Sequence, residues 1–197
     1  NDFFVSNEKI ALSRETEHNE RKILELSKPE SFSLYVGIPF CPSRCSYCSF
    51  VMASIERAEK LIEPYTKLLC EEIKRTAEIA NKLGLRLETV YFGGGTPTTL
   101  SAEQLDTVLR TVDKSFDMST CREFTVEAGR PDTIDIAKLF ALKENKVDRI
   151  SINPQTVNDE VLKTIGRKHT AQQFFDAFEL ALSLIHISEP TRLLSIS

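Results

Sequence analysis

Three cysteines, Cys41, Cys45 and Cys48, lie within eight residues in the segment IPFCPSRCSYCSF. Thiolates spaced four and then three residues apart in one loop can surround one metal centre. Three thiolates on a cubane iron–sulfur cluster leave one iron without a protein ligand, and that iron can bind a substrate or cosubstrate. The spacing therefore favours an open [4Fe–4S] site.

Zinc and unrelated thiols are the alternatives for these cysteines. A structural zinc site is normally closed by four ligands. The other histidines and cysteines are distant in sequence: His18, His169, His186, Cys70 and Cys121. An odd number of cysteines without a signal segment argues against a disulfide framework and favours a reducing, cytoplasmic compartment.

A glycine run, Gly93–Gly95, forms the second motif and is followed by Thr96. It comes directly after a β-rich segment. A backbone without side chains can approach a ligand closely and offer its N–H groups. A tight turn is the alternative explanation of the glycines alone.

The segments around these motifs alternate between strand and helix patterns. The sequence predicts a long helix from near Pro64 to Gly84, a helix opened by the capping box Ser101–Gln104, and a helix capped by Asp132 or Thr133. A short helix between Asn158 and Gly166 and a last helix opened by Thr170–Gln173 complete the set. Strands are expected at 33–38, 88–92, 123–127 and 149–153.

This β-α-β-α order predicts an α/β fold with a parallel sheet and right-handed crossovers. Both motifs follow strand ends, which is where ligands bind in such folds. Periodicity alone leaves open whether the sheet is doubly wound or part of a barrel. We expect Ile136, Leu139 and Phe140 to face inward, together with Phe174, Phe175 and Phe178.

The composition is that of a globular protein, with 41% hydrophobic and 27% charged residues in 197. A net charge of −4 argues against a nucleic-acid binder that relies on bulk positive charge. The longest apolar run, Ala177–Ile187, is too short for a membrane span. Residues 1–30 are polar and are expected to form a weakly helical lead-in or linker.

The cysteine loop resembles that of the radical S-adenosylmethionine (SAM) superfamily. The strings Tyr35–Cys41 and Tyr91–Thr98 are similar to one branch of it, the oxygen-independent coproporphyrinogen III oxidases and their relatives. Val126–Asp132 and Ser151–Thr156 resemble the HemZ-type coproporphyrinogen dehydrogenases. The resemblance runs from about Ser33 to Ala181 and implies a partial (β/α) TIM-like barrel, truncated to about four βα units.

The resemblance also implies roles for individual residues. Cys41, Cys45 and Cys48 would hold a [4Fe–4S] cluster, and Glu127 would pair with the ammonium group of SAM. Strand packing for Tyr35, a solvated strand end for Glu127 and surface positions for Gln155 and Arg167 are the alternatives. The SAM contacts implied by the family pattern are Tyr35, Tyr47 at the adenine, Gly94, Gly95 and Thr96 at the methionine moiety, Glu127, Gln155 and Arg167.

By the same resemblance, the activity is oxidative decarboxylation of coproporphyrinogen III to protoporphyrinogen IX in haem biosynthesis, with a low-potential electron donor as partner. A haem chaperone or carrier on the same scaffold is the alternative. One oxidase branch has a further cysteine close after the third cluster ligand, and this chain has Ser49 and Phe50 there.

The family pattern stops at about Ala181, so 31–181 is predicted to be the partial radical SAM core. Residues 182–197 read as a non-native ending that contains Pro190 and lacks a strand pattern. We therefore expect the chain to be a fragment of a longer protein, and to show no substantial catalysis by itself.

Overall fold

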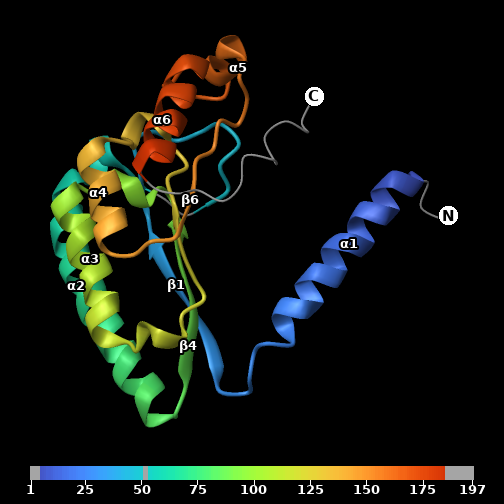
Figure 1. Cartoon of the computed structure of the whole chain (residues 1–197). Helices are drawn as coiled ribbons and strands as arrows, with labels where there is room; N and C mark the ends of the chain where they lie inside the picture. Colours follow the sequence, from blue (N-terminus) through green and yellow to red (C-terminus); the bar gives the residue numbers. More distant parts are fainter. Residues whose placement is uncertain (1–4, 51–52, 185–197) are drawn as a thin grey trace. The chain divides into compact units, whose positions relative to one another are not determined.

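The computed structural model describes residues 5–50 and 53–184 (Figure 1), so most of the predicted ending at 182–197 lies outside the described residues. The chain divides into two compact units, Asn1–Ser31 and Phe32–Ser197. The first contains helix α1 (Asn7–Leu24), and no residue of this described helix is buried. Its start is fixed by the Ser6 hydroxyl, which accepts a hydrogen bond from the Lys9 N–H at 3.3 Å.

A four-stranded sheet forms the centre of the second unit, in the order β1 (Ser31–Ile38), β4 (Arg86–Gly94), β5 (Glu123–Glu127) and β6 (Arg149–Ser151). The pairs β4–β5 and β5–β6 are parallel, and β1 and β4 run in the same direction in Figure 1. The predicted α/β fold with a parallel sheet is therefore confirmed.

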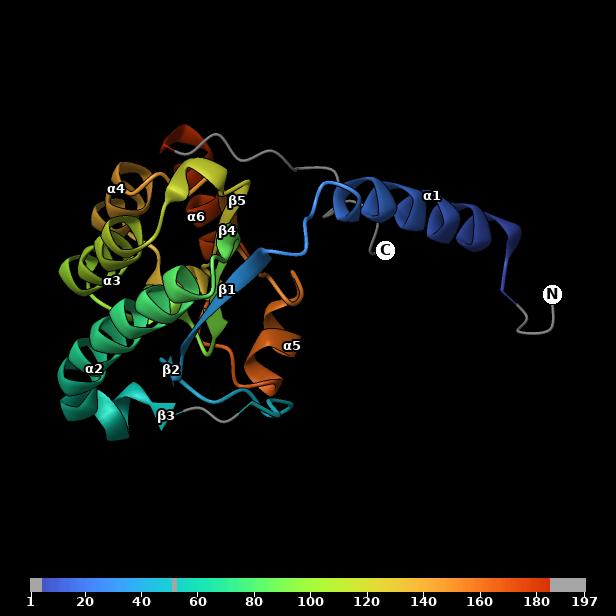
Figure 2. The same cartoon turned by 90° about the horizontal axis from the view of Figure 1, so that it is seen from below.

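Three helices lie between successive strands of this sheet: α2 (Ile55–Lys82), α3 (Ala102–Ser115) and α4 (Ile136–Glu144). Two more, α5 (Asp159–Thr164) and α6 (Ala171–Leu184), follow β6. Figures 1 and 2 show α2, α3 and α4 side by side on one face of the sheet. The core lies between this helix layer and the sheet, where Val90 and Phe92 of β4 meet Leu105 and Leu109 of α3, all almost fully buried.

The alternation of side chains along the strands separates this apolar face from a polar one. Val36 and Ile38 of β1 are buried in the core, whereas Tyr35, directly before Val36, is 59% exposed. Tyr91 follows the same alternation in β4, between buried Val90 and Phe92. The face of the sheet opposite the helices can therefore present polar groups to a ligand.

Two predicted helix starts differ from the structure. Helix α2 begins at Ile55, and Pro64 lies inside it; burial of Ala58 and Ile62 before the proline and of Leu69 after it holds one continuous helix. Helix α4 is capped by Asp135, whose carboxylate accepts from the Lys138 N–H at 2.8 Å.

The predicted inward faces are partly wrong. In α4, Leu139 and Leu142 are buried, whereas Ile136 and Phe140 are 54% and 47% exposed. In α6, Phe174 is buried and Phe175 is exposed. Both predicted capping boxes are present, because Gln104 and Ser101, like Gln173 and Thr170, exchange side-chain to backbone hydrogen bonds.

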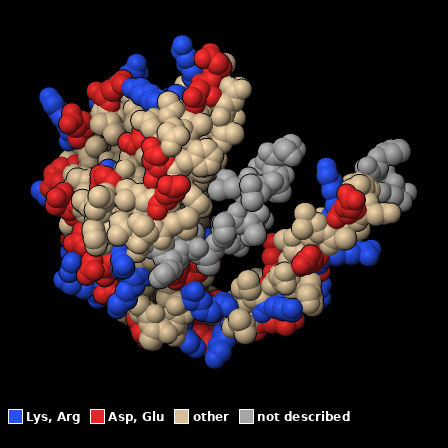
Figure 3. Space-filling model, turned by 45° about the horizontal axis from the view of Figure 1, so that its top comes forward, with Lys and Arg blue, Asp and Glu red and all other residues tan. Residues whose placement is uncertain are grey.

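Acidic and basic side chains are interspersed over the second unit on the face drawn in Figure 3. Among the described helices, none has both the length and the apolar composition that a membrane span requires.

Candidate cofactor-binding site

The cysteine loop leaves β1 and is held at both ends. A two-stranded parallel sheet joins β2 (Phe40–Cys41) to β3 (Ala53–Ser54), and the Ala53 N–H donates to the Pro39 carbonyl at 2.8 Å. These pairs bring the start and the end of the loop together beside the carboxyl end of β1. Two-residue strands are too short to show a sequence pattern.

The three loop thiols differ in their surroundings. Cys41 is buried, and Cys45 and Cys48 are half-buried; all are free thiols. The Cys41 sulfur lies 3.3 Å from the Thr96 hydroxyl. Burial raises the pKa of Cys41, while the hydrogen bond with Thr96 and the charge of Arg130 oppose the rise, and the neighbouring Cys48 and Cys45 add to it. Cys45 and Cys48 therefore lie close enough to Cys41 for their charges to act on it.

The glycine run crosses closely over the chain that enters the cysteine loop. The Gly95 N–H donates to the Ile38 carbonyl at 2.7 Å and the Thr96 N–H to the Phe40 carbonyl at 2.8 Å. A Cβ atom on Gly95 would lie 2.5 Å from the Phe40 carbonyl oxygen. Gly94 adopts a φ of 102°, a left-handed backbone that favours glycine. The glycines thus fix the end of β4 against the cysteine loop, and they line the space beside it.

The polar face of the sheet carries a carboxylate at the end of β5. The rings of Tyr35 and Tyr91 are stacked, with centroids 5.8 Å apart, and the Tyr91 hydroxyl donates to Glu127 Oε1 at 2.5 Å. Burial and this hydrogen bond raise the pKa of Tyr91, and burial followed by the charge of Glu127 raises the pKa of Tyr35. Both phenols therefore remain neutral donors beside the carboxylate.

Arg167 joins the loops that follow β5 and β6 to the cysteine loop. Its guanidinium donates to the Gly129 carbonyl at 2.7 Å and to the Tyr47 hydroxyl at 3.4 Å. Among the described residues, its buried Nε atom has no hydrogen-bond partner. An unsatisfied buried donor at a cavity is suited to a polar ligand.

Gln155 lies in the loop after β6, which stops at Ser151, two residues before the predicted strand end at 153. Its backbone has a φ of 62°, which is uncommon for a residue other than glycine. This turn brings the side chain to the same cavity as Arg167.

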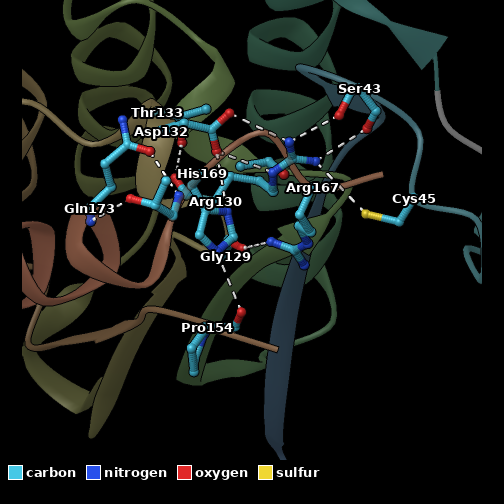
Figure 4. Close-up of polar contacts among 12 residues, drawn as sticks. Ser43, Cys45, Gly129, Arg130, Asp132, Thr133, Pro154, Arg167, His169 and Gln173 are labelled. Carbon is cyan, nitrogen blue, oxygen red and sulfur yellow. Dashed lines mark hydrogen bonds and ion pairs between the residues drawn. The ribbon is translucent and has the colours of Figure 1, made fainter. Parts of the chain in front are cut away.

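Sequence reasoning assigned no role to Arg130, which the structure places at the centre of the polar contacts in Figure 4. The side chain is only 2% exposed. It contacts Ser43 and Cys45 of the cysteine loop and Asp132 of its own turn. The one available signal was its position inside the motif Val126–Asp132.

Beyond Asp132 lies His169, which is almost fully buried. Its Nε2 atom is 3.4 Å from the Pro154 carbonyl, and its Nδ1 atom is 3.9 Å from Asp132 Oδ1. Burial lowers the pKa of His169, partly offset by the Pro154 carbonyl. The residue is a buried neutral group behind the site, two residues before the start of α6.

One cavity of about 210 Å³ collects these elements. Phe50, Gly129, Arg130, Ser151 and Asn153 line it in addition to every site residue that the sequence predicted. The predicted residues that line it are Tyr35, Cys41, Cys45, Tyr47, Cys48, Gly94, Gly95, Thr96, Glu127, Gln155 and Arg167. Their roles in binding stay predictions, but the structure brings them to one place.

The three loop cysteines can be compared with the ligands that zinc and an iron–sulfur cluster require. Within the described ranges, no three His, Cys, Asp or Glu side chains lie close enough to hold one metal ion. A structural zinc site is normally closed by four ligands around one ion, whereas three cysteines line this cavity. In a cubane cluster each thiolate binds a different iron, so three cysteines at one cavity suit a cluster that leaves one iron open.

The comparisons with known proteins agree with this chemistry. The sequence model of the Radical SAM superfamily matches residues 35–189. An "oxygen-independent coproporphyrinogen-III oxidase-like protein HemZ" of Bacillus subtilis is 38% identical over 91% of this chain and 36% of its own length. A "heme chaperone HemW" of Lactococcus lactis is 41% identical over 78% of this chain and 38% of its own length.

An oxygen-independent coproporphyrinogen III oxidase of Paracoccus denitrificans is 34% identical over 79% of this chain and 33% of its own length. Among solved structures, coproporphyrinogen III oxidase (HemN) from Escherichia coli, described as a radical SAM enzyme, superposes with a TM-score of 0.69 at 27% identity. The superposition covers 78% of this chain and 34% of that one. The likeness confirms the predicted partial barrel, and the chain spans about a third of the length of these relatives.

Proposed function

Because the chain belongs to the radical SAM superfamily, we propose that Cys41, Cys45 and Cys48 hold its [4Fe–4S] cluster and that the adjoining cavity binds SAM. Membership of this superfamily implies both cofactors. When bound, they supply one-electron, hydrogen-abstracting chemistry, while the protein positions and shields them. The observation that supports the proposal is the convergence of the three cysteines, the glycine run and Glu127 on one cavity.

The residues around the cavity suit the parts of SAM. The Glu127 carboxylate can pair with an ammonium group, and it is already oriented by Tyr91. The Arg167 guanidinium can donate to a carboxylate or to ribose oxygens through its remaining N–H groups. Tyr47, tied to Arg167, offers an aromatic face for the adenine. Tyr35, Gly94, Gly95, Thr96 and Gln155 complete the proposed contacts.

For the whole protein, we propose oxygen-independent oxidative decarboxylation of coproporphyrinogen III to protoporphyrinogen IX, with a low-potential electron donor and a cytoplasmic location. The match to the HemZ-like relative covers 91% of this chain. The matched fraction of the chain is larger than the fraction made up by the second unit, Phe32–Ser197. The similarity therefore includes residues of the first unit. Neither the chaperone match, over 78% of the chain, nor the Paracoccus denitrificans oxidase match, over 79%, requires residues of the first unit.

A haem chaperone or carrier is the second candidate. The Lactococcus lactis chaperone is 41% identical to this chain over 78% of it. Phe50 lines the cavity just after the third cysteine, where one oxidase branch has a further cysteine. An apolar ring there suits haem binding as well as porphyrinogen turnover.

Anaerobic turnover separates the two candidates. The sample is protein that contains this chain, reconstituted with iron and sulfide. It is mixed with SAM, a reductant and coproporphyrinogen III. Chromatography then quantifies 5′-deoxyadenosine and the divinyl product. An oxidase forms both, and Cys45→Ser abolishes them. Stoichiometric haem binding without decarboxylation would instead support the chaperone, and absence of 5′-deoxyadenosine with every substrate would contradict radical SAM activity.

A further inference from the structure

Arg130 lies between the end of β5 and the cysteine loop, and it contacts residues more than eighty positions earlier in the chain. Its Nη1 atom donates to the Ser43 carbonyl at 3.3 Å, and its Nη2 atom donates to the Ser43 hydroxyl at 3.0 Å. Nη1 also lies 3.8 Å from the Cys45 sulfur, within hydrogen-bonding range for sulfur (Figure 4). One guanidinium therefore holds two neighbouring points of the cysteine loop.

The opposite side of the guanidinium is fixed by Asp132. Nε lies 3.2 Å from Oδ1 of that carboxylate, and Nη2 lies 3.4 Å from Oδ2. The turn that carries Asp132 is itself braced, because the Thr133 hydroxyl donates to the Arg130 carbonyl at 2.7 Å and Lys138 Nζ donates to the Thr133 carbonyl at 2.9 Å. The direction in which Arg130 points is therefore set by contacts within the chain itself.

Burying the Arg130 guanidinium costs free energy of folding unless other groups interact with its charge. A buried arginine needs pairing and hydrogen bonds to offset its desolvation. The Asp132 carboxylate neutralises one side, and the positive N–H groups face the loop and its sulfur. Hydrogen bonds to ligating sulfurs and nearby charge are the means by which proteins tune the reduction potential of iron–sulfur clusters.

We propose that Arg130 is a positioning residue for the cluster, because it holds the loop at Ser43 and donates to the Cys45 sulfur. These contacts raise the reduction potential of the cluster and slow the loss of the cluster from the protein. The inference rests on the proposed function, in which Cys45 is a cluster ligand. Wild-type protein is therefore measured first, because failure to bind iron and sulfide would overturn that assignment and not the role of Arg130.

The decisive variant is the double replacement Arg130→Met/Asp132→Asn. Replacing Arg130 alone leaves the Asp132 carboxylate beside an apolar side chain, whereas the double variant removes both charges and leaves the net charge unchanged. Arg130→Lys keeps the charge, but its single ammonium cannot reach Ser43 at two atoms and Asp132 at the same time. Arg75→Met is the matched control, since Arg75 is exposed on α2 and pairs with Glu78.

Two properties of the reconstituted protein are measured without SAM: the midpoint potential, by redox titration followed by electron paramagnetic resonance, and the rate of iron release to a chelator. We expect the double variant to have a more negative potential and to release iron roughly 10-fold faster or more, the usual range for losing a partner of a metal ligand. Arg130→Lys should release iron faster at a potential close to that of the wild type. Arg75→Met should change neither property.

A wild-type potential in the double variant overturns the proposal, whatever happens to iron release. If that variant retains too little cluster for titration, Arg130→Lys decides: faster iron release supports the proposal, and release as slow as in the wild type overturns it. An ion pair with a purely structural role would lower the unfolding temperature of both variants and leave the potential unchanged.

Discussion

The Tyr91 hydroxyl donates a hydrogen bond to Glu127 Oε1 at 2.5 Å and so links neighbouring strands β4 and β5 on the polar face of the sheet. The carboxylate is thereby oriented at the carboxyl end of β5. One oxygen is occupied by the phenol, and the carboxylate has a second oxygen that can accept from a cationic ligand.

Removing the Glu127 charge should weaken SAM binding. A hydrogen bond to a charged group contributes about 1.5–3 kcal/mol, so Glu127→Gln is expected to raise the dissociation constant of SAM roughly tenfold or more. Calorimetric titration of reconstituted protein measures it. Glu123→Gln is the matched control, because Glu123 lies at the opposite end of the same strand. Equal affinities for SAM in Glu127→Gln and the wild type would contradict this role.

Tyr91→Phe should act more on stability than on binding. The variant keeps the ring that stacks on Tyr35 and loses only the hydroxyl, so the free energy of unfolding should fall by about 1 kcal/mol. Chemical denaturation provides the measurement. No loss of stability would show that the hydrogen bond to Glu127 contributes nothing net.

Gly95→Ala should disrupt the crossing of the glycine run over the cysteine loop. The added methyl group would meet backbone oxygen atoms, which cannot turn away as a side chain can. We expect the free energy of unfolding to fall by about 1–3 kcal/mol, the usual cost of overpacking. In Gly129→Ala, the nearest atom to the new Cβ is 4.0 Å away, so this control should be nearly neutral. Similar denaturation midpoints for both variants would refute the close approach.

His169 should make stability depend on pH. Burial lowers the pKa of this histidine in the folded state, so the unfolded chain takes up the proton at higher pH. The free energy of unfolding therefore decreases as the pH falls through the ordinary histidine pKa of about 6.5, and the dependence ends below the lowered folded-state value. Asp132 faces the ring and opposes the effect, whereas Arg167 and Arg130 reinforce it.

Denaturation curves at several pH values between 8 and 5, about the range in which histidines titrate, test this prediction. His169→Gln should flatten the dependence relative to the wild type. His18→Gln, at an exposed position on α1, should leave it unchanged. A wild-type slope in His169→Gln would rule out the buried histidine as the source.

The fold class and the family could be predicted from local patterns: alternating strand and helix segments, capping boxes and the cysteine loop. Arg130 could not, because its contacts with Ser43 and Cys45 exist only after β5 and the loop are brought together. The pair β2–β3 consists of two-residue strands, which leave no periodicity to read. The start of α2 was missed because core burial on both sides overrides the proline at position 64.

The central claim is that Cys41, Cys45 and Cys48 together hold an iron–sulfur cluster, and metal and sulfide analysis after anaerobic reconstitution tests it most directly. We predict about four iron and four sulfide per chain. Cys45→Ser should lose them, while Cys121→Ser, whose sulfur donates to the Glu123 carbonyl at 3.4 Å, should retain them. Zinc in place of iron, or equal iron in both variants, would contradict the claim.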